Sequence, residues 1–253
     1  MNDPTARQAA LVTGGAVRLG RAIALALARQ GFDIALHYHS SQAAAERTRA
    51  EIEQLGVACQ IFQQDLARAD RLAGLLASVR ERFPGLTVLV NSASGYGQAA
   101  IRETTPELFD AQLAVNLRAP FFLTQAFARP GQRGNVINIL DNKIGFNQYQ
   151  YAAYLLAKKS LAEFTRMAAL EFAPDIRVNG VAPGVVLPAK SRTQAYIDWR
   201  VQGIPLKMQG DTAHITRTIS YILENDFVTG QIFVVDGGES VAHVGQNAAD
   251  YAD

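Results

Sequence analysis

The amino-acid sequence predicts an α/β protein, built on a doubly wound parallel sheet of about seven strands with helices between them. Three observations predict this fold. Short apolar runs rich in Val, Ile and Leu recur along the chain, longer amphipathic segments separate them, and a glycine-rich turn follows the first run. Parallel strands are buried on both faces, so they read as continuous apolar runs rather than as alternating ones.

Each expected strand corresponds to one apolar run. The runs cover residues 9–14, 33–39, 58–65, 87–93, 135–140, 176–184 and 231–238. The helices between them include 21–31 and 42–56, which should stop at Gly31 and Gly56, because glycine adopts the left-handed conformation that ends many helices. This alternation, without an internal repeat or a linker, predicts a single domain over residues 1–253.

Length, charge and cysteine content narrow the class of protein. A chain of 253 residues, 49% of them hydrophobic, can bury one large core. The net charge of +1 gives no electrostatic reason to expect nucleic acid or an anionic membrane as a partner. We find no signal peptide and no run near the ~20 apolar residues of a membrane span. Cys59 is the single cysteine and metal-ligand spacings are missing, so we expect a cytoplasmic protein without a metal site.

The turn after the first run, TGGAVRLG, has the composition of a phosphate-binding loop. Gly14, Gly15 and Gly20 let the backbone turn tightly and approach a ligand closely. The N-terminus of the following helix offers free N–H groups to phosphate oxygens. The spacing differs from the common G-x-G-x-x-G form, so a glycine-rich turn without a ligand is an alternative. Its position between the first strand and the first helix favours a nucleotide.

The end of the second run indicates which nucleotide binds. Proteins that select NAD usually carry Asp or Glu there, hydrogen-bonded to the ribose 2′-hydroxyl. Here the segment reads LHYHSS and lacks a carboxylate, and Arg18 in the glycine turn adds a cation, so we expect NADP(H) as the cofactor. The residues expected around the 2′-phosphate are His37, Tyr38, His39, Ser40 and Ser41. In an alternative interpretation, His37 faces the core and His39 faces solvent.

Tyr154 and Lys158, in YLLAK, form a candidate catalytic pair. Four residues apart in a helix, they share one face, and an ammonium near a phenol lowers the phenol pKa by favouring the phenolate. The tyrosine would then exchange protons near neutral pH. The Y-x-x-x-K pattern alone is unspecific, but Asp141 precedes Tyr154 by thirteen residues and Asn116 lies upstream in LAVNLRAPFF.

Together these motifs resemble the short-chain dehydrogenase/reductase family over nearly the whole chain. The matching segments are TGGAVRLG, QQDL, NSAS, VN at 115–116, YLLAK, RVNGVAPG and FVTGQIFVVDGG. The resemblance implies a Rossmann-type fold, NAD(P)-dependent hydride transfer and a tetramer. It also implies that Tyr154 donates a proton, that Lys158 binds the nicotinamide ribose and lowers the tyrosine pKa, and that Asn116 holds a proton-relay water. The further cofactor contacts that it implies are Gly14, Leu19, Gly20, Asp65, Leu66, Asn91, Ser92, Ala93, Ser94, Pro183, Gly184 and Val185.

At the positions where the sequence departs from the usual family pattern, it resembles the pteridine reductase branch of the family. Arg18 replaces the usual third glycine, N-S-A-S replaces N-N-A-G, and Asp141 stands where the family carries a catalytic serine. The HYHSS segment is similar to that branch as well, although Ser40 stands where the branch has arginine. The resemblance implies that Tyr96 sandwiches a pterin against the nicotinamide. The implied substrate contacts are Arg18, Ser94, Tyr96, Asp141 and Tyr154.

Of these residues, Asp141 says most about the chemical class of the substrate. An ionised carboxylate cannot donate a hydrogen bond to a substrate carbonyl, and it would repel the developing oxyanion. It suits a substrate that carries N–H donors, or a ring nitrogen that is protonated as hydride arrives, and pterins offer both. Two alternatives remain: a protonated Asp141 that delivers the proton itself, and an Asp141 that only caps the turn at DNK.

We therefore expect an NADPH-dependent reductase that transfers hydride to a C=N bond of a pterin of the dihydrobiopterin, dihydromonapterin or dihydrofolate class. One alternative is a short-chain carbonyl reductase for 3-oxoacyl or other ketone substrates. The other is a regulator that senses NADP without turnover, against which Tyr154, Lys158 and Asn116 argue. The expected partners are a small-molecule substrate and further copies of the chain in a homotetramer.

Overall fold

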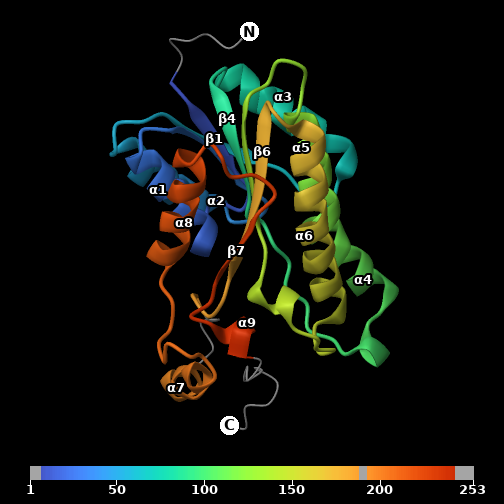
Figure 1. Ribbon diagram of the computed structural model, residues 1–253. Coiled ribbons are helices and arrows are strands. Elements are labelled where there is room, and N and C mark those ends of the chain that lie inside the picture. The colour runs from blue at the N-terminus through green and yellow to red at the C-terminus, as the bar shows by residue number, and fades with distance from the viewer. Residues whose placement is uncertain (1–6, 188–192, 243–253) are drawn as a thin grey trace.

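The computed structural model describes residues 7–187 and 193–242, and within them the chain forms one seven-stranded sheet (Figure 1). The strand order is β3-β2-β1-β4-β5-β6-β7, and every neighbouring pair is parallel. The strands are β1 (Ala9–Val12), β2 (Asp33–Tyr38), β3 (Cys59–Gln63), β4 (Leu86–Asn91), β5 (Gly134–Ile139), β6 (Ile176–Pro183) and β7 (Ile232–Val235). Each predicted apolar run forms one of these strands, so the predicted doubly wound α/β fold is confirmed.

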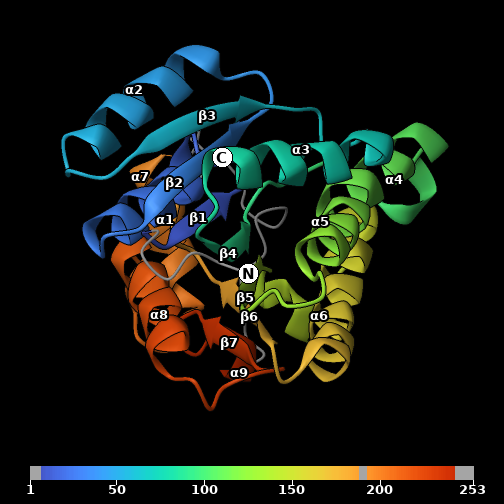
Figure 2. The ribbon, with the colours of Figure 1, turned by 90° about the horizontal axis from the view of Figure 1, so that it is seen from above.

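Helices connect the strands and cover both faces of the sheet. They are α1 (Arg18–Arg29), α2 (Gln42–Glu53), α3 (Ala69–Arg82), α4 (Pro106–Leu113), α5 (Ala119–Phe127), α6 (Ala152–Phe172), α7 (Gln194–Gln202), α8 (Thr212–Glu224) and α9 (Glu239–Ala242). Three short helical segments add η1 (Ile101–Glu103), η2 (Ala114–Arg118) and η3 (Asn142–Gly145). Figure 2 shows α1 and α8 on one face and α3, α5 and α6 on the other.

The buried residues of β1 show why the strands read as continuous apolar runs. Ala10 and Val12 belong to the core cluster on the side of α1 and α8, whereas Ala9 and Leu11 belong to the cluster on the side of α3, α5 and α6. All four are fully buried. Successive strand side chains point to opposite faces, so a strand between two layers of helices must be apolar at every position.

Glycines end the first two helices as predicted. Gly31 follows α1 with a φ of 90°, and Gly56 follows α2 with a φ of 80°, both in the left-handed region. α1 begins at Arg18, inside the glycine turn and before the start expected at residue 21. Of the helices in the described ranges, none combines the length and apolar character needed to cross a bilayer.

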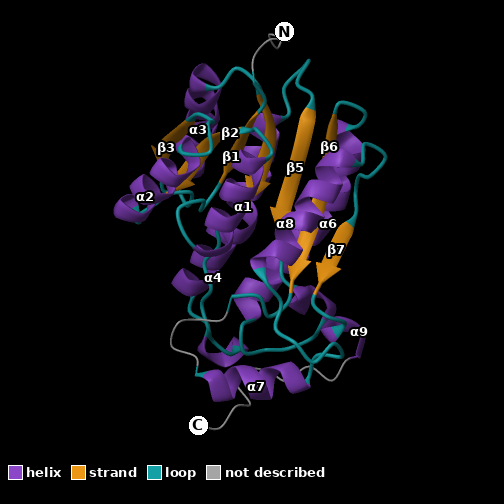
Figure 3. Ribbon diagram, turned by 90° about the vertical axis from the view of Figure 1, so that its left-hand side faces the viewer, coloured by secondary structure: helices purple, strands orange, loops and turns teal. Residues whose placement is uncertain are grey.

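The carboxyl ends of the strands all point toward the end of the molecule that carries α7 and α9 (Figure 3). The chain winds in opposite directions from β1, with β2 and β3 on one side and β4 onward on the other. In doubly wound sheets, ligands bind outside the carboxyl ends at such a switch point. The fold thus places the residues that follow β1, β4, β5 and β6 around one site.

Candidate active site

The glycine turn after β1 is packed too tightly for side chains. Gly14 has a φ of 64°, and a Cβ atom there would lie 3.0 Å from the Cα of Ala93. A Cβ on Gly20 would lie 2.2 Å from the carbonyl oxygen of Gly14. The start of α1 therefore sits directly on the turn, and its free N–H groups face the space beyond the sheet. This cradle fits a phosphate-bearing ligand.

His37 supports the turn from the core side. Its Nδ1 accepts a hydrogen bond from the Gly14 N–H at 3.1 Å, and its Nε2 lies 2.9 Å from the Gln64 carbonyl oxygen, to which it donates. Burial lowers the pKa of His37 to about 4, so the ring is neutral at pH 7. Both ring nitrogens of His37 are thus engaged within the protein, which fits the alternative interpretation of this segment: His37 is buried beneath the turn, and His39 is exposed.

A cavity of about 870 Å³ opens at the carboxyl ends of the strands. Most of the predicted cofactor residues line it: Gly14, Arg18, Leu19, Gly20, His37, His39, Asp65, Leu66, Ser92, Ala93, Ser94, Tyr154, Lys158, Pro183, Gly184 and Val185. Of the remaining four, Tyr38 turns into the core, Asn91 is buried and donates to Asn138, and Ser40 and Ser41 are exposed outside the lining. The side-chain alternation of β2 sends Tyr38 to the face of the sheet covered by α1 and α8, where its side chain packs in the core and does not line the cavity.

Thr13 joins the two central strands beneath this cavity, a role that the sequence analysis missed. Its hydroxyl accepts hydrogen bonds from the N–H groups of Ser92 at 2.9 Å and Ala93 at 3.0 Å, and donates to the Val90 carbonyl. The hydroxyl residue directly before the double glycine was the available signal. Through it, the glycine turn and the NSAS segment hold a fixed relative position.

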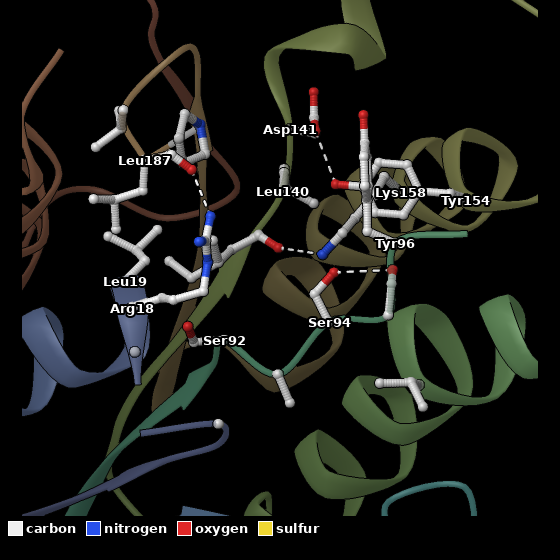
Figure 4. A pocket seen from close by; sticks show the side chains of 18 of the residues that line it. Arg18, Leu19, Ser92, Ser94, Tyr96, Leu140, Asp141, Tyr154, Lys158 and Leu187 are labelled. Atoms are coloured by element: carbon white, nitrogen blue, oxygen red, sulfur yellow. Dashed lines mark hydrogen bonds between the residues drawn. The ribbon is translucent and has the colours of Figure 1, made fainter. Parts of the chain in front are cut away.

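Tyr154 and Lys158 project from one face of α6 toward the cavity, as their spacing predicted (Figure 4). The Tyr154 hydroxyl donates to Oδ2 of Asp141 at 2.8 Å. The Lys158 ammonium donates to the Ile139 carbonyl at 2.8 Å and lies 5.8 Å from the centroid of the Tyr154 ring. The structure thus brings together Tyr154, Lys158 and Asp141 from the start of α6 and the end of β5.

The pKa values of this pair differ from the expectation. Burial raises the pKa of Tyr154 well above its usual value, and the Asp141 carboxylate raises it further. Burial lowers the pKa of Lys158 to about 8. The surroundings of Tyr154 thus raise its pKa, whereas the sequence predicted a lowering by Lys158: the ammonium is directed to a main-chain carbonyl, and the group hydrogen-bonded to the phenol is the Asp141 carboxylate.

Asp141 divides its two oxygens between two roles. Oδ1 accepts from the Lys143 N–H at 2.8 Å and caps the short helix η3, which the sequence analysis treated as an alternative to a role in the site. Oδ2 accepts from Tyr154. The carboxylate is thus both a cap and a neighbour of the catalytic candidate. The cap fixes its orientation, because rotating the carboxylate away from Tyr154 would also break the contact with Lys143.

Asn116 is fully buried and reaches the site through a neighbour. It lies in η2, a π-helical segment of the kind often found at functional sites. Its Oδ1 accepts from the Ser94 hydroxyl at 2.7 Å, and its Nδ2 donates to the Gly95 carbonyl at 3.0 Å. Ser94 lines the cavity, whereas Asn116 does not. The prediction of a water held by Asn116 therefore stays a prediction.

Aromatic rings form one wall of the cavity. Tyr96 stacks on Tyr151 at a centroid distance of 4.6 Å and meets Tyr154 edge-on at 4.8 Å. It is 62% exposed, so a large part of its ring remains open. Tyr196 of α7 also lines the cavity. Of these rings, the sequence analysis named Tyr96 and Tyr154. The other lining residues, which it missed, include Val115, Leu140, Asn142, Lys143, Gln148, Tyr151, Leu187, Tyr196 and Arg200.

Arg18 stands at the cofactor end of the same cavity. Its φ of 52° is in the left-handed region, which is costly for a residue with a Cβ. Its guanidinium donates to the Leu187 carbonyl, which brings the glycine turn to the segment after β6 (Figure 4). The side chain is exposed and keeps further N–H donors for an anion.

Comparisons with known proteins find relatives that match nearly the whole chain. A family model described as enoyl-(acyl carrier protein) reductase matches residues 15–240. The 3-oxoacyl-[acyl-carrier-protein] reductase of a Synechocystis species is 32% identical over 91% of this chain and 96% of its own. FolM alternative dihydrofolate reductase 1 from Brucella suis, crystallised with NADP, superposes with a TM-score of 0.88 at 32% identity, covering 97% of this chain and 98% of that chain. A putative short-chain alcohol dehydrogenase from Sinorhizobium meliloti gives 0.86 at 27% identity, over 92% and 96%.

A parallel sheet with a glycine-rich first turn, and a tyrosine and lysine on one helix face beside it, define an oxidoreductase. The matches show that the chain belongs to the short-chain dehydrogenase/reductase family, as its motifs implied. Support for the narrower pteridine reductase branch is weaker. Two similar structures are alternative dihydrofolate reductases, while several curated relatives are 3-oxoacyl-[acyl-carrier-protein] reductases.

Proposed function

We propose that the protein is an NADPH-dependent reductase that transfers hydride to a C=N bond of a dihydropterin. The observation that carries this proposal is the 2.8 Å contact between the Tyr154 hydroxyl and Oδ2 of Asp141. In a ketone reductase, the position of Asp141 would need a donor for the substrate oxygen. A carboxylate there suits a ring that presents N–H groups, as a dihydropterin does.

Three features support NADP(H) as the cofactor. The glycine turn leaves no room for a Cβ at Gly14 or Gly20, so a pyrophosphate can approach the backbone and the N-terminus of α1. The end of β2 lacks a carboxylate, and His39 and Arg18 line the cavity at that end. The similar Brucella suis structure was crystallised with NADP. When bound, this cofactor supplies the hydride.

Side chains of the protein then donate the proton and bind the substrate ring. Tyr154 is kept protonated by burial and by Asp141, so its hydroxyl is a proton source for a ring nitrogen that gains charge. Lys158 lies over the ring and stabilises the phenolate that remains after the proton leaves. Asp141 accepts an N–H from the substrate and fixes the orientation of the ring. The open part of Tyr96 offers a stacking surface for that ring.

A second candidate is reduction of a 3-oxoacyl thioester, favoured by the curated relatives that carry this activity in their names. The same Tyr154 and Lys158 would serve a ketone. Asp141 would then face the substrate oxygen with a carboxylate, which opposes that reaction unless the carboxylate carries a proton. One substitution therefore separates the two functions.

We predict that Asp141→Ser loses most pterin reduction and gains weak ketone reduction. An unpaired substrate N–H costs about 1–3 kcal/mol before any loss of proton transfer, which corresponds to roughly 5- to 150-fold in kcat/KM. The serine hydroxyl restores a donor for a carbonyl. The measurement is kcat/KM of the wild type and the variant for dihydrobiopterin and for an activated ketone.

We also predict that the wild type binds NADPH at least tenfold more tightly than NADH, a difference in binding free energy of ~1.4 kcal/mol.

Asp70→Ser is the matched control, because Asp70 is an exposed carboxylate on α3 paired with Arg68. It should leave both activities unchanged. Unchanged pterin reduction in Asp141→Ser would contradict the role of Asp141, and efficient ketone reduction by the wild type would favour the second candidate. A wild type that turns over neither substrate would support the NADP-sensing regulator.

A further inference from the structure

Glu239 is a buried carboxylate that joins three segments at the substrate end of the cavity. It opens α9 and has no exposed surface. Its Oε2 accepts from the Asn142 amide at 2.9 Å, and its Oε1 accepts from the Lys143 ammonium at 3.2 Å, both in η3. Oε1 also pairs with the guanidinium of Arg200 in α7. The three partners all line the cavity.

Lys143 connects this cluster to the proposed catalytic residues. Its N–H donates to Oδ1 of Asp141, while its side chain reaches Glu239. The other oxygen of Asp141 accepts from Tyr154. A continuous path of contacts therefore runs from Glu239 through Lys143 and Asp141 to the Tyr154 hydroxyl.

The segment that carries this path depends on outside support. η3 has four residues, too few for a helix to be stable by itself. Its first residue, Asn142, is held by Glu239 and by Oδ2 of Asp236 at 3.3 Å. The contacts to Asp236 and Glu239 thus add to the local hydrogen bonds that hold η3 in position.

Arg200 extends the cluster to α7. It is 4% exposed, and within the described residues its Nη1 has no hydrogen-bond partner, so the pairing with Glu239 orients its guanidinium. α7 also contributes Tyr196 to the cavity. A buried charge without its partner is strongly unfavourable, so α7, η3 and α9 are coupled in one arrangement.

We propose that Glu239 is a positioning residue, which sets the Asp141–Tyr154 contact through η3 and the substrate wall through α7. The inference rests on the proposed function in one respect: Asp141 is taken to act on the substrate. Glu239 itself touches neither Asp141 nor Tyr154, so its effect on the reaction passes through Lys143 and Arg200.

Glu239→Gln is the sharpest variant. The amide has the same shape, but one end becomes an NH₂ donor. Donors approach both ends of the side chain, namely Asn142 on one oxygen and Lys143 with Arg200 on the other. In either orientation of the glutamine, its NH₂ group faces one of these donors, so at least one hydrogen bond or ion pair of Glu239 is lost.

Two readouts test the positioning role. The first is steady-state kinetics of Glu239→Gln with any substrate that the wild type reduces. We expect kcat to fall at least tenfold and substrate KM to rise, while KM for NADPH stays within twofold of the wild-type value. The second is hydrogen exchange of the Lys143 amide, which should be at least tenfold faster. That amide is protected by Asp141, and its exchange needs no substrate, so it tests the inference even if the proposed pterin chemistry fails.

Two further variants complete the test. Arg80→Lys is the structural control, because Arg80 is half-buried between α3 and α5 and donates to the Ala126 and Phe127 carbonyls away from the cavity. It should lower stability without changing kcat or Lys143 exchange. Arg200→Lys keeps a cation beside Glu239 and should retain at least a third of wild-type kcat, whereas Arg200→Gln should raise substrate KM at least fivefold.

A folded Glu239→Gln protein with wild-type kcat and unchanged Lys143 exchange would overturn the proposal. So would kinetic changes in Arg80→Lys as large as those in the cluster variants, since they would trace the loss to general destabilisation. If Glu239→Gln does not fold, the comparison of Arg200→Lys with Arg200→Gln decides the question in the same way: equal substrate KM values would contradict the positioning role.

Discussion

Tyr154 is kept protonated by its surroundings. Burial and the Asp141 carboxylate raise its pKa, and the Lys158 ammonium lies 5.8 Å from the centroid of its ring, where it can stabilise a phenolate once the proton has left. The tyrosine is therefore protonated before the reaction and supported after it. A group with these properties is suited to donate one proton per turnover.

We predict that Tyr154→Phe lowers kcat by about 10²-fold or more, the usual scale of general acid catalysis. Binding of NADPH, followed by fluorescence titration, should stay within a few-fold, because the ring and Lys158 remain. Tyr151→Phe is the matched control, since this neighbouring buried hydroxyl donates to Gln98 instead of Asp141. Near-normal turnover in Tyr154→Phe would assign the proton to another residue.

His37 links the pH dependence of stability to the cofactor turn. Its folded-state pKa of about 4 lies below the ordinary value of 6.5. Between these values, the unfolded chain takes up a proton that the folded chain does not. Stability from this residue is therefore present above pH 6.5 and is lost as the pH falls toward 4.

We predict that this contribution, on the order of 3 kcal/mol, disappears in His37→Gln. The free energy of unfolding of the wild type should fall more steeply between pH 7 and pH 5 than that of the variant, as measured by urea denaturation. His39→Gln is the control, because His39 is exposed. Parallel pH profiles of the wild type and His37→Gln would show that His37 titrates normally in the folded protein.

At the scale of the elements, the turn between β1 and α1 is set by atomic contacts rather than by glycine content. Gly20 is already helical, yet its Cα faces the Gly14 carbonyl, and an added Cβ would overlap that oxygen at 2.2 Å. The atoms that the added Cβ would meet are backbone atoms, which cannot move aside as the end of a flexible side chain can. The helix start and the turn are therefore one rigid unit.

We predict that Gly20→Ala weakens NADPH binding at least tenfold and lowers the free energy of unfolding by about 1–3 kcal/mol, the cost of overpacking. Gly74→Ala is the control: Gly74 lies inside α3, and an added Cβ meets nothing within 4 Å. That variant should gain up to about 1 kcal/mol from helix propensity. Isothermal titration and thermal unfolding measure both effects, and normal affinity in Gly20→Ala would contradict the rigid turn.

On the scale of the whole molecule, α5 and α6 present apolar side chains to the surface. The exposed members are Phe121 and Phe122 on α5, and Leu156, Met167 and Leu170 on α6, the last of them 83% exposed. Figure 1 shows the two helices side by side along one flank of the molecule. Exposed apolar patches are typical of surfaces that bind another protein.

We predict that a second copy of the chain covers this flank within a homotetramer. Light scattering after size exclusion should give four times the chain mass of 27.4 kDa. Leu170→Lys should reduce the mass to that of smaller species, because it buries a charge in the contact. Leu55→Lys, at an exposed position after α2, should leave the mass unchanged. A monomeric wild type would contradict the assembly.

The sequence by itself determined the strands, their parallel pairing, the glycine turn and the pair of Tyr154 and Lys158. These features have short periods: apolar runs, helix stops, and two side chains four residues apart on one helix. The strands, the helix stops and the tyrosine–lysine pair depend on neighbours along the chain, so local pattern was sufficient for them. The parallel pairing joins strands as far apart in sequence as β1 and β4, and it followed from the alternation of strands and helices. The Tyr38 side chain was misplaced because an apolar run does not say to which face of the sheet each side chain of β2 points.

Only the tertiary structure decided how Asp141 is used. The sequence offered a cap or a role in the site as alternatives, and folding gave one oxygen to Lys143 and the other to Tyr154. Glu239 lies 97 positions beyond Asn142, and its pairing with η3 and α7 left no signal of spacing or composition. Contacts across such distances arise when separate elements pack at the same end of a sheet, and their geometry is set by that packing.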